Sequence, residues 1–325
     1  MKALLCTRLG GPDDLEVQEL ADPVAGPHEA VVRIEAAALN FFDTLIIAGK
    51  YQTKPALPFS PAAEFAGTVE SIGAEVRGFA PGDRVAANIG YGAARQRIAV
   101  AADALVKIPA GLDADRAAGI VVTYGTALHA LKDRAALQHG ETLAVLGASG
   151  GVGVAAIELG KIMGARVIAC ASAAEKLDFA RAYGADEVVN YASEDLRTGL
   201  KRLGGEHGID VIFDPVGGSY AEPALRSLAW EGRFLVIGFA AGDIPRLPLN
   251  LILLKGCDVR GVHWGAWAAR NAVAHRANTA ELLAWCASGK LSAHVDAVYP
   301  LERAAEALHR LKDRAAMGKL VLRPW

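Results

Sequence analysis

The chain has 325 residues, of which 52% are hydrophobic and 22% charged, and its formal net charge is −2. This composition excludes a disordered protein, and the length favours two domains over one. The charges nearly balance and no block of Lys or Arg stands out, which argues against a protein that binds nucleic acid by neutralising phosphates.

The cysteines and the terminus indicate the compartment. The four cysteines are far apart and include no C-x-x-C pair, which favours reduced, buried thiols over disulfides or a structural zinc site: Cys6, Cys170, Cys257 and Cys286. The N-terminal apolar stretch is too short for a signal peptide, and no window reaches the roughly twenty apolar residues of a membrane span. We expect a soluble cytoplasmic protein.

The first third of the chain alternates short apolar runs with turn residues. Gly10-Gly-Pro-Asp13 and Ala80-Pro-Gly-Asp83 are such turns. Between the turns we expect strands over residues 3–6, 30–38, 65–72, 84–87, 95–100 and 105–108. Regular short strands with few helices indicate a mostly β unit that forms a partly closed barrel.

From about Asp113 the pattern changes to helices and then to alternating strands and helices. Helices are expected over 114–120, 123–136, 154–163, 175–183, 196–203 and 221–230, and strands over 143–146, 167–171, 187–190, 211–213, 234–237 and 257–262. Apolar strands spaced by helices predict a parallel sheet that is covered on both faces. The tail should add helices over 266–288 and 302–314 and strands over 294–299 and 319–322, and fold back onto the N-terminal unit.

A glycine-rich turn follows the first strand of the alternating region. Gly147, Gly150 and Gly153 have the spacing G-x-x-G-x-x-G, and not the commoner G-x-G-x-x-G. Glycines alone are also explained by their conformational freedom. The flanking strand, helix and second strand favour a dinucleotide site, because such a site needs a tight turn, a close backbone and a helix N-terminus that faces the pyrophosphate.

Seven stretches spread over the chain carry a family resemblance: Ala37–Asp43, Gly49–Tyr51, Pro58–Gly67, Pro81–Val85, Gly147–Gly153, Asp214–Gly218 and Gly318–Leu322. In this order they resemble the medium-chain dehydrogenase/reductase superfamily, and within it the zinc-free, ζ-crystallin-like NADPH:quinone oxidoreductases. The resemblance implies an α/β fold, in which a Rossmann doubly wound parallel sheet is inserted in a mostly β, partly closed barrel (GroES-like) catalytic domain. It implies a catalytic domain over 1–121 and 264–325, an NADP-binding domain over 122–263, and an active-site cleft between them.

The positions that hold zinc in metal-dependent relatives carry other residues here. Those relatives have a Cys near the helix that should begin around Asn40, and a His next to Glu64, where this chain has Ala63. No Cys-rich lobe is present, and the histidines show no ligand spacing. Because a tetrahedral zinc site needs about three protein ligands, we predict that the protein binds no metal.

The residues after the second strand of the alternating region indicate the cofactor. Ser172 and Lys176 suit the 2′-phosphate of NADPH, whereas Glu175 would not, unless it faces solvent. The alternative is that Lys176 is an ordinary solvated lysine. The resemblance implies that Tyr191 lies at the adenosine end of the cofactor; the alternative is that Tyr191 is only a packing residue. It also implies that the segments 237–240 and 262–264 lie near the nicotinamide. The residues expected to bind NADPH are Asn40, Thr126, Ser149, Gly150, Gly151, Val152, Ser172, Lys176, Tyr191, Gly238, Phe239, Ala240, Val262, His263 and Trp264.

Hydride transfer to a conjugated acceptor needs placement and a donor to the developing oxyanion. Asn40 is the first candidate for that donor, and His263 is a candidate proton donor. Asp43, Tyr51 and Thr126 are further candidates for contact with the ligand. The alternatives are that Asp43 only caps a helix, that Tyr51 only packs in a turn, and that Thr126 is an ordinary helix residue. Many family members have a Tyr at the position of Leu45, so this pocket is expected to be more apolar.

These residues predict an NADPH-dependent reductase that transfers hydride to quinones without a metal. The first alternative is a reductase of activated alkenes such as enones, 2-alkenals or enoyl thioesters, and the second is a protein that binds NADPH without catalysis. A zinc alcohol dehydrogenase fits least. The expected partners are a small-molecule substrate and a second copy of the chain, paired through the apolar strand near Val259–Val262; neither nucleic acid nor a membrane is expected.

Overall fold

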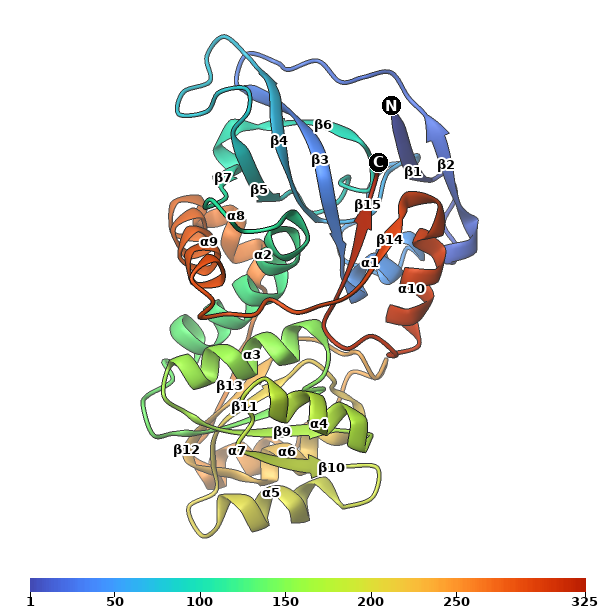
Figure 1. Cartoon of the computed structure of the whole chain (residues 1–325). Coiled ribbons are helices and arrows are strands. Elements are labelled where there is room, and N and C mark those ends of the chain that lie inside the picture. The colour runs from blue at the N-terminus through green and yellow to red at the C-terminus, as the bar shows by residue number, and fades with distance from the viewer. The chain divides into compact units, whose positions relative to one another are not determined.

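The computed structural model describes all 325 residues and divides into two compact units (Figure 1). One unit comprises Met1–Gly125 and Ala268–Trp325, and the other comprises Thr126–Trp267. From the sequence we expected the divisions after residues 121 and 263. None of the helices combines the length and the hydrophobicity that a bilayer crossing requires.

The Thr126–Trp267 unit is a doubly wound parallel sheet. Its six strands lie in the order β10-β9-β8-β11-β12-β13, and every neighbouring pair is parallel. This is the Rossmann order, in which the chain starts in the middle of the sheet and winds first to one edge and then to the other. The strands are β8 (Thr142–Leu146), β9 (Arg166–Ala171), β10 (Glu187–Asn190), β11 (Ile209–Asp214), β12 (Leu228–Val236) and β13 (Asp258–Gly261).

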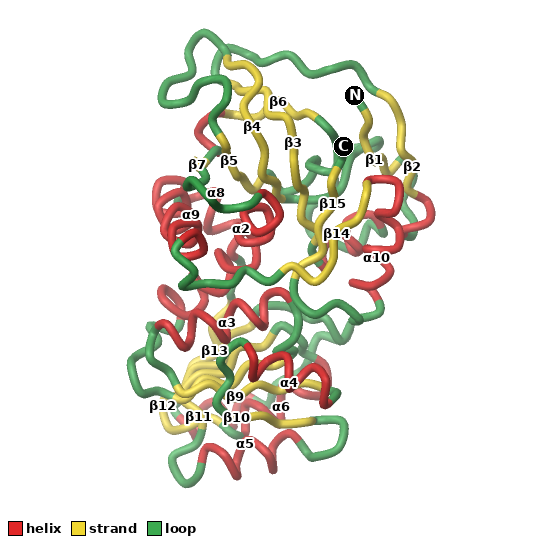
Figure 2. Tube along the Cα trace, in the orientation of Figure 1, coloured by secondary structure: helices red, strands yellow, loops and turns green.

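Helices cover both faces of this sheet. Within the unit, α3 and α4 lie on one face and α5 and α6 on the other (Figures 1 and 2). The central strands are therefore buried on both sides, and residues 143–146 are apolar without interruption. The helices are α3 (Gly151–Ile162), α4 (Ala174–Ala182), α5 (Leu196–Gly204), α6 (Ala221–Arg226) and α7 (Leu249–Lys255).

The other unit is mostly β. A sheet runs in the order β14-β15-β3-β4-β5-β7, and β6 and β15 pair with the first and the last part of β3. The end strands β14 and β7 do not pair with each other, so hydrogen bonding does not close this sheet into a barrel. The strands are β3 (Glu29–Leu39), β4 (Glu64–Ile72), β5 (Arg84–Asn88), β6 (Arg97–Ala101), β7 (Val106–Lys107), β14 (Val295–Pro300) and β15 (Lys319–Arg323), and β1 (Lys2–Cys6) and β2 (Leu15–Glu19) form a separate hairpin.

Helices α1 and α10 pack together beside this sheet. They meet a core formed by alternate residues of β3, β4 and β15, among them Ile34, Phe65 and Leu320. The helices are α1 (Phe41–Ile47), α2 (Ala114–Leu128), α8 (Trp264–Arg270), α9 (Ala272–Ala287) and α10 (Ala304–Lys312), of which α8 belongs mainly to the other unit. Single turns of other helix types occupy Pro12–Asp14, Ala102–Ala104, His129–Arg134, Gly218–Tyr220 and Leu301–Arg303.

The expected break between helices 114–120 and 123–136 was wrong, because α2 continues through it to Leu128 and a π-helical turn follows. The sequence pattern still marks an irregular point. The backbone N–H of Val122 donates to the Glu64 carboxylate at 2.6 Å, so a side chain inserts into the helix at this position.

Two further expectations on element boundaries need correction, and two elements were not predicted. The expected helix 266–288 is two helices that break at Asn271, whose backbone (φ −129°, ψ 49°) is not helical. Helix α6 ends at Arg226, earlier than expected, because β12 already begins at Leu228. Neither β2 nor α7 was predicted from the sequence. In α7 only Leu251 and Ile252 pack against the core, and the other three leucines are exposed, so the apolar residues do not mark one buried face: Leu249, Leu253 and Leu254.

Candidate functional site

The glycine turn between β8 and α3 has the geometry of an anion-binding turn. Gly147 has φ +59°, which favours glycine, and Gly150 is the N-cap of α3 without any side chain capping the helix. A Cβ on Gly153 would lie 2.4 Å from the carbonyl oxygen of Gly147. The first N–H groups of α3 have no partner within the helix, so they are free to bind a phosphate.

A second loop supports this turn from the neighbouring strand. The Asp214 carboxylate, at the end of β11, accepts hydrogen bonds from the N–H groups of Val216 and Gly217 at 2.8 and 2.9 Å, and burial raises the pKa of Asp214. Val216 in turn lies against Gly147, where an added Cβ would come within 3.0 Å of it. The expected role of the segment 214–218, to fix the position of the cofactor, fits this contact and stays a prediction.

Apart from Thr126 and Lys176, which lie in helices, the expected cofactor residues of this unit lie at the carboxyl-terminal end of the sheet. They follow the carboxyl ends of five parallel strands, where ligands gather in such sheets. In the order of the strands, Tyr191 follows β10, Ser172 follows β9, the glycine turn with Ser149, Gly150, Gly151 and Val152 follows β8, Gly238, Phe239 and Ala240 follow β12, and Val262, His263 and Trp264 follow β13. The residues expected at the adenosine end and at the nicotinamide end therefore lie on opposite sides of the glycine turn.

Individual side chains along this edge differ in exposure. Ser172 is exposed, and Lys176 is half-buried in the first turn of α4. Tyr191 packs against Tyr220, with 4.5 Å between the ring centroids. The planes of the two rings are tilted by 44° to each other.

The residues that follow β13, at the expected nicotinamide end, also differ in exposure. His263 is exposed, whereas Trp264 is buried, and Trp267 stacks on His129 with 4.3 Å between the centroids. Trp267 therefore makes an aromatic contact inside this unit. Thr126 lies in α2, at the first residue of the unit.

The Met1–Gly125/Ala268–Trp325 unit contains the other candidates in a buried polar cluster of Asn40, Asp43, Glu64 and Lys319. All four side chains are buried, with relative exposures of 6, 0, 0 and 3%. The Lys319 ammonium donates to Glu64 Oε1 at 2.7 Å, to Asn40 Oδ1 at 2.7 Å and to the Leu39 carbonyl at 2.9 Å. The Asn40 amide donates to Glu64 Oε1 at 2.9 Å.

Asp43 connects this cluster to the loop before β4. Its carboxylate accepts from the N–H of Asn40 at 2.7 Å, as a helix cap, and from the N–H of Ala62 at 3.0 Å. Ala62 has φ +66°, a left-handed conformation that is rare for alanine. Burial raises the pKa of Asp43 to about 7, against the opposing effect of the two N–H donors and Lys319.

Tyr51 lies outside the cluster's hydrogen bonds. Its ring stacks on Phe42 with 5.4 Å between centroids, and burial raises the pKa of its phenol, with the Asp43 carboxylate adding to the shift. The predicted catalytic residues thus divide between the two units: Asn40, Asp43 and Tyr51 belong to one, and Thr126 and His263 to the other.

The residues at the expected zinc positions do not fit a zinc ion. Ala63 offers no donor atom, and Asn40 and Glu64 already bind the Lys319 ammonium, whose positive charge opposes a cation at the same place. Elsewhere in the chain, no group of three or more His, Cys, Asp or Glu side chains converges as metal ligands would.

Three residues of these sites were missed from the sequence as site residues: Glu64, Lys319 and Tyr220. Glu64 and Lys319 each start a strand and are followed there by apolar residues, and a buried charged residue at such a position needs a partner. That signal was present, but it does not reveal the partner. Tyr220 carries no sequence signal, because its contact with Tyr191 depends on how β10 and β11 are placed.

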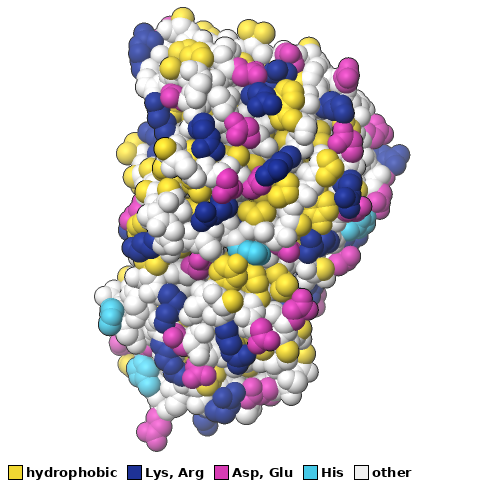
Figure 3. Space-filling view, viewed as in Figure 1, with side chains coloured by type: hydrophobic (Ala, Val, Ile, Leu, Met, Phe, Trp, Pro, Cys, Tyr) yellow, Lys and Arg dark blue, Asp and Glu magenta, His cyan; other side chains and the backbone are white.

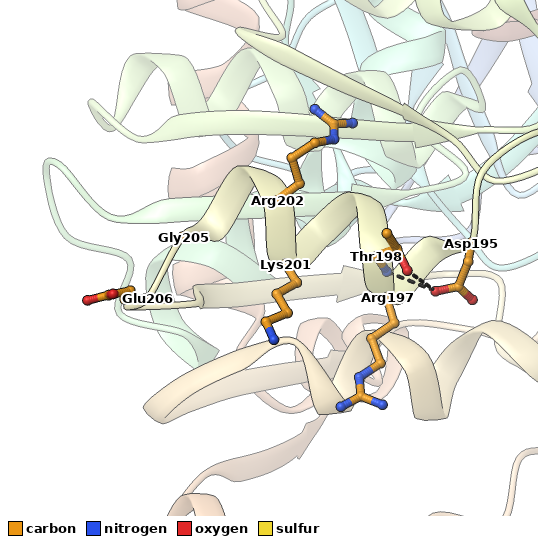
Figure 4. A pocket seen from close by; sticks show the side chains of 7 residues that line it. All are labelled: Asp195, Arg197, Thr198, Lys201, Arg202, Gly205 and Glu206. Carbon is orange, nitrogen blue, oxygen red and sulfur yellow. Dashed lines mark hydrogen bonds between the residues drawn. The ribbon is translucent and has the colours of Figure 1, made fainter.

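Two hollows lie beside α5 and contain none of the expected site residues. Asp195, Arg197, Thr198, Lys201, Arg202, Gly205 and Glu206 line the first, and Figure 4 shows Arg197 and Lys201 directed away from the helix. Asp195 is occupied as the N-cap, accepting from both the backbone and the hydroxyl of Thr198. A charged lining of this kind does not suit an apolar acceptor.

Comparisons with known proteins agree with this architecture. Residues 26–110 match the family model of the alcohol dehydrogenase GroES-like domain, and residues 151–285 match that of the zinc-binding dehydrogenases. The chain is 37% identical over 322 residues to quinone oxidoreductase-like protein 2 of Rattus norvegicus, covering 99% of this chain and 91% of that one. It is 32% identical to the quinone oxidoreductase of Sus scrofa, covering 99% and 97%. The structure of Escherichia coli quinone oxidoreductase complexed with NADPH superposes with a TM-score of 0.92 at 29% identity and covers 100% of both chains.

Proposed function

The chain belongs to the quinone oxidoreductase-like family of the medium-chain dehydrogenase/reductase superfamily, and on that basis we propose that it is an NADPH-dependent reductase that transfers hydride to quinones without a metal ion. The observation that carries this proposal is the glycine turn at the N-terminus of α3, with candidate cofactor residues on both sides of it along one sheet edge. A bound NADPH would supply the hydride there.

The choice of NADPH over NADH follows from the residues after β9. A carboxylate at this place would hold the ribose hydroxyls of NADH, but Ser172 stands there and Lys176 lies one turn into α4. An ammonium attracts the 2′-phosphate that distinguishes NADPH. Glu175 in the same turn is exposed, so water screens its opposing charge.

The absence of a metal ion from the mechanism rests on the buried polar cluster. The Lys319 ammonium already binds both Asn40 and Glu64, and its positive charge opposes a metal cation beside them. A quinone is activated by its own conjugation, so placement and a hydrogen-bond donor are sufficient to promote hydride transfer. Asn40 is the proposed donor.

The first alternative is reduction of activated alkenes, which accept hydride at a carbon conjugated to a carbonyl in the same way. Leu45, a half-buried residue of α1, favours it, because an apolar side chain replaces the tyrosine that many relatives have. The second alternative, NADPH binding without turnover, is compatible with the same glycine turn.

A steady-state panel tests these functions. Purified protein with NADPH is assayed against 1,4-benzoquinone, 9,10-phenanthrenequinone, a 2-alkenal and crotonyl-CoA. We expect the highest kcat/KM with the quinones. A large preference for the alkenal or the thioester would overturn the quinone assignment, and tight NADPH binding without oxidation by any acceptor would support the second alternative. Elemental analysis of the same sample should find no stoichiometric zinc.

We also propose that two copies pair through β13. This strand ends the sheet with one unpaired edge, and the exposed Val259 lies on it. Exposed leucines of α7 lie nearby in the chain, and edge strands with apolar neighbours favour pairing with another strand. Light scattering should show a dimer for the wild type and a monomer for the variant Val259→Pro; a dimer that survives this change would contradict pairing at β13.

On the face shown in Figure 3, Lys and Arg side chains are interspersed with Asp and Glu. A surface of this kind lacks the continuous basic stripe that binding to a phosphate backbone requires. It is consistent with a small-molecule substrate.

A further inference from the structure

Lys319 is a buried charged residue without a role in the proposed hydride transfer. It begins β15, close to the C-terminus, and its side chain is 3% exposed. Its ammonium uses all three N–H groups, on Glu64, Asn40 and the Leu39 carbonyl. Burying a charge is costly unless it is fully paired, and here the pairing is complete.

The contacts of Lys319 determine the orientation of the Asn40 amide. A lysine can only donate and a carboxylate can only accept, so Asn40 Oδ1 must face Lys319 and Nδ2 must face Glu64. The amide nitrogen carries a second hydrogen, which has no acceptor within the protein. Asn40 keeps 6% of its surface exposed, so this N–H is not fully enclosed.

The same contacts polarise the amide. A positive charge 2.7 Å from Oδ1 withdraws electron density from the nitrogen, and hydrogen bonds strengthen one another in a buried chain of this kind. The Glu64 carboxylate, which accepts from the other Nδ2–H, acts in the opposite direction, so the second Nδ2–H would be a weaker donor without the Lys319 charge.

We propose that Lys319 is a positioning residue for the reduction: it polarises the Asn40 amide and, together with Glu64, orients it, so that the second Nδ2–H binds the acceptor oxygen on which negative charge develops. This inference rests on the proposed function. Reduction adds a hydride from the reduced nicotinamide to a carbon conjugated to the acceptor carbonyl, the electron pair moves to the oxygen, and water protonates that oxygen. Asn40 donates a hydrogen bond throughout and loses no proton.

The first test compares three variants by single-turnover oxidation of bound NADPH with a series of substituted 1,4-benzoquinones. Asn40→Ala and Lys319→Met should each lower the rate roughly 10- to 100-fold, and the loss should grow as the quinone becomes a weaker electrophile. Because both changes act through the same hydrogen bond, from Asn40 to the acceptor, the double variant should be no slower than the slower single variant. Losses that multiply would overturn the proposal.

A matched control is available in the same unit. Lys2 pairs with Glu302 at 2.8 Å, the same chemistry as Lys319 with Glu64, but on the surface with relative exposures of 48 and 54%. Lys2→Met should leave the rate and its dependence on the quinone unchanged. In Lys319→Met and Lys2→Met the Kd of NADPH, whose expected site is mainly in the other unit, should stay within about two-fold of the wild type.

A compensating variant separates positioning from folding. Lys319→Met leaves Glu64 buried without a cation, so the protein could lose its fold for that reason alone. Lys319→Met combined with Glu64→Gln removes both charges and should recover the Tm. If the rate remains low while the Tm recovers, the positioning role is supported; if the rate recovers with the Tm, the pair is only structural and the proposal is wrong. A wild type that reduces no acceptor would instead contradict the proposed function.

Discussion

The glycine turn and the buried polar cluster are two polar sites built in opposite ways. The turn is one continuous stretch, Gly147–Gly153, and it presents backbone groups with hardly any side chain. The cluster consists of side chains from α1 and its cap, β4 and β15, and two of its members, Glu64 and Lys319, are 255 residues apart in the chain.

The two sites are therefore stabilised by different physical effects. The turn depends on steric space, because any Cβ at Gly153 would overlap the backbone of Gly147 and Ala148. The cluster depends on charge compensation in a buried environment, where losing one partner leaves the other unpaired. A change at the turn should therefore affect ligand binding first, and a change in the cluster should affect folding and the proposed chemistry.

The largest effect is expected at Glu64. Glu64→Gln leaves the Lys319 ammonium buried without a carboxylate, and breaking a buried ion pair costs about 3–5 kcal/mol of unfolding free energy. Urea unfolding measures the loss. The control Glu302→Gln breaks the exposed pair with Lys2, whose strength water screens, and should leave the midpoint unchanged. Equal losses of unfolding free energy for the two variants would show that burial does not make the Glu64–Lys319 pair more important than the exposed pair.

The next effect is expected at the turn. Gly153→Ala places a methyl group 2.4 Å from the Gly147 carbonyl oxygen, so the turn must shift and the N–H groups of α3 lose their alignment. We expect NADPH affinity to fall about 100-fold, which corresponds to roughly 2.7 kcal/mol. Fluorescence titration with NADPH measures it. Gly265→Ala, at a helical glycine with open space around it, should bind as the wild type does.

A smaller, pH-dependent effect is expected from Asp43. Burial raises the pKa of Asp43 to about 7 from its ordinary 3.8, so between these values the folded protein keeps a proton that the unfolded chain has lost. The stabilisation that this group contributes is present below the ordinary pKa and is lost as the pH rises to about 7. Asp43→Asn should remove this decline, while its amide NH2 group mispairs one of the two N–H donors at every pH.

The unfolding free energy of the wild type minus that of Asp43→Asn, followed by urea unfolding, should therefore decrease from about pH 4 to about pH 7 and then stay constant. Asp83 provides the opposite case, because its hydrogen bond from Lys107 lowers its pKa. The ionised Asp83 therefore stabilises the folded protein at neutral pH, and the wild type loses this stabilisation as the pH falls. Asp83→Asn should be less stable than the wild type at neutral pH, and the difference should shrink on acidification. A difference curve for Asp43 that is flat between these pH values would contradict the raised pKa.

The smallest effect is expected at the adenosine end of the turn. Lys176→Ala removes one partly exposed ammonium from the first turn of α4, and such charges contribute about 1 kcal/mol. The affinity for NADPH should fall about five-fold, while the affinity for NADH stays the same, and added salt should reduce the difference. Equal losses for both nucleotides would mean that Lys176 does not bind the 2′-phosphate.

Much of the fold could be predicted because it depends on neighbours in sequence. The order of strands and helices in the Thr126–Trp267 unit follows from apolar runs and turns, and β10 begins and ends where it was expected. The errors lie where contacts distant in sequence decide the local structure. Glu64 accepts a hydrogen bond from the Val122 N–H within α2, and the three exposed leucines of α7 do not form one buried face.

The candidate sites divide in the same way. The amino-acid sequence by itself determined the glycine turn, since steric limits on Gly147 and Gly153 act within a few residues, and it also carried the pattern of the family. Only the tertiary structure decided what surrounds Asn40, because a buried charge such as Lys319 is stable only where distant strands bring it a carboxylate and an amide. Pairing across the fold is a property of three-dimensional packing, and no spacing along the chain encodes it.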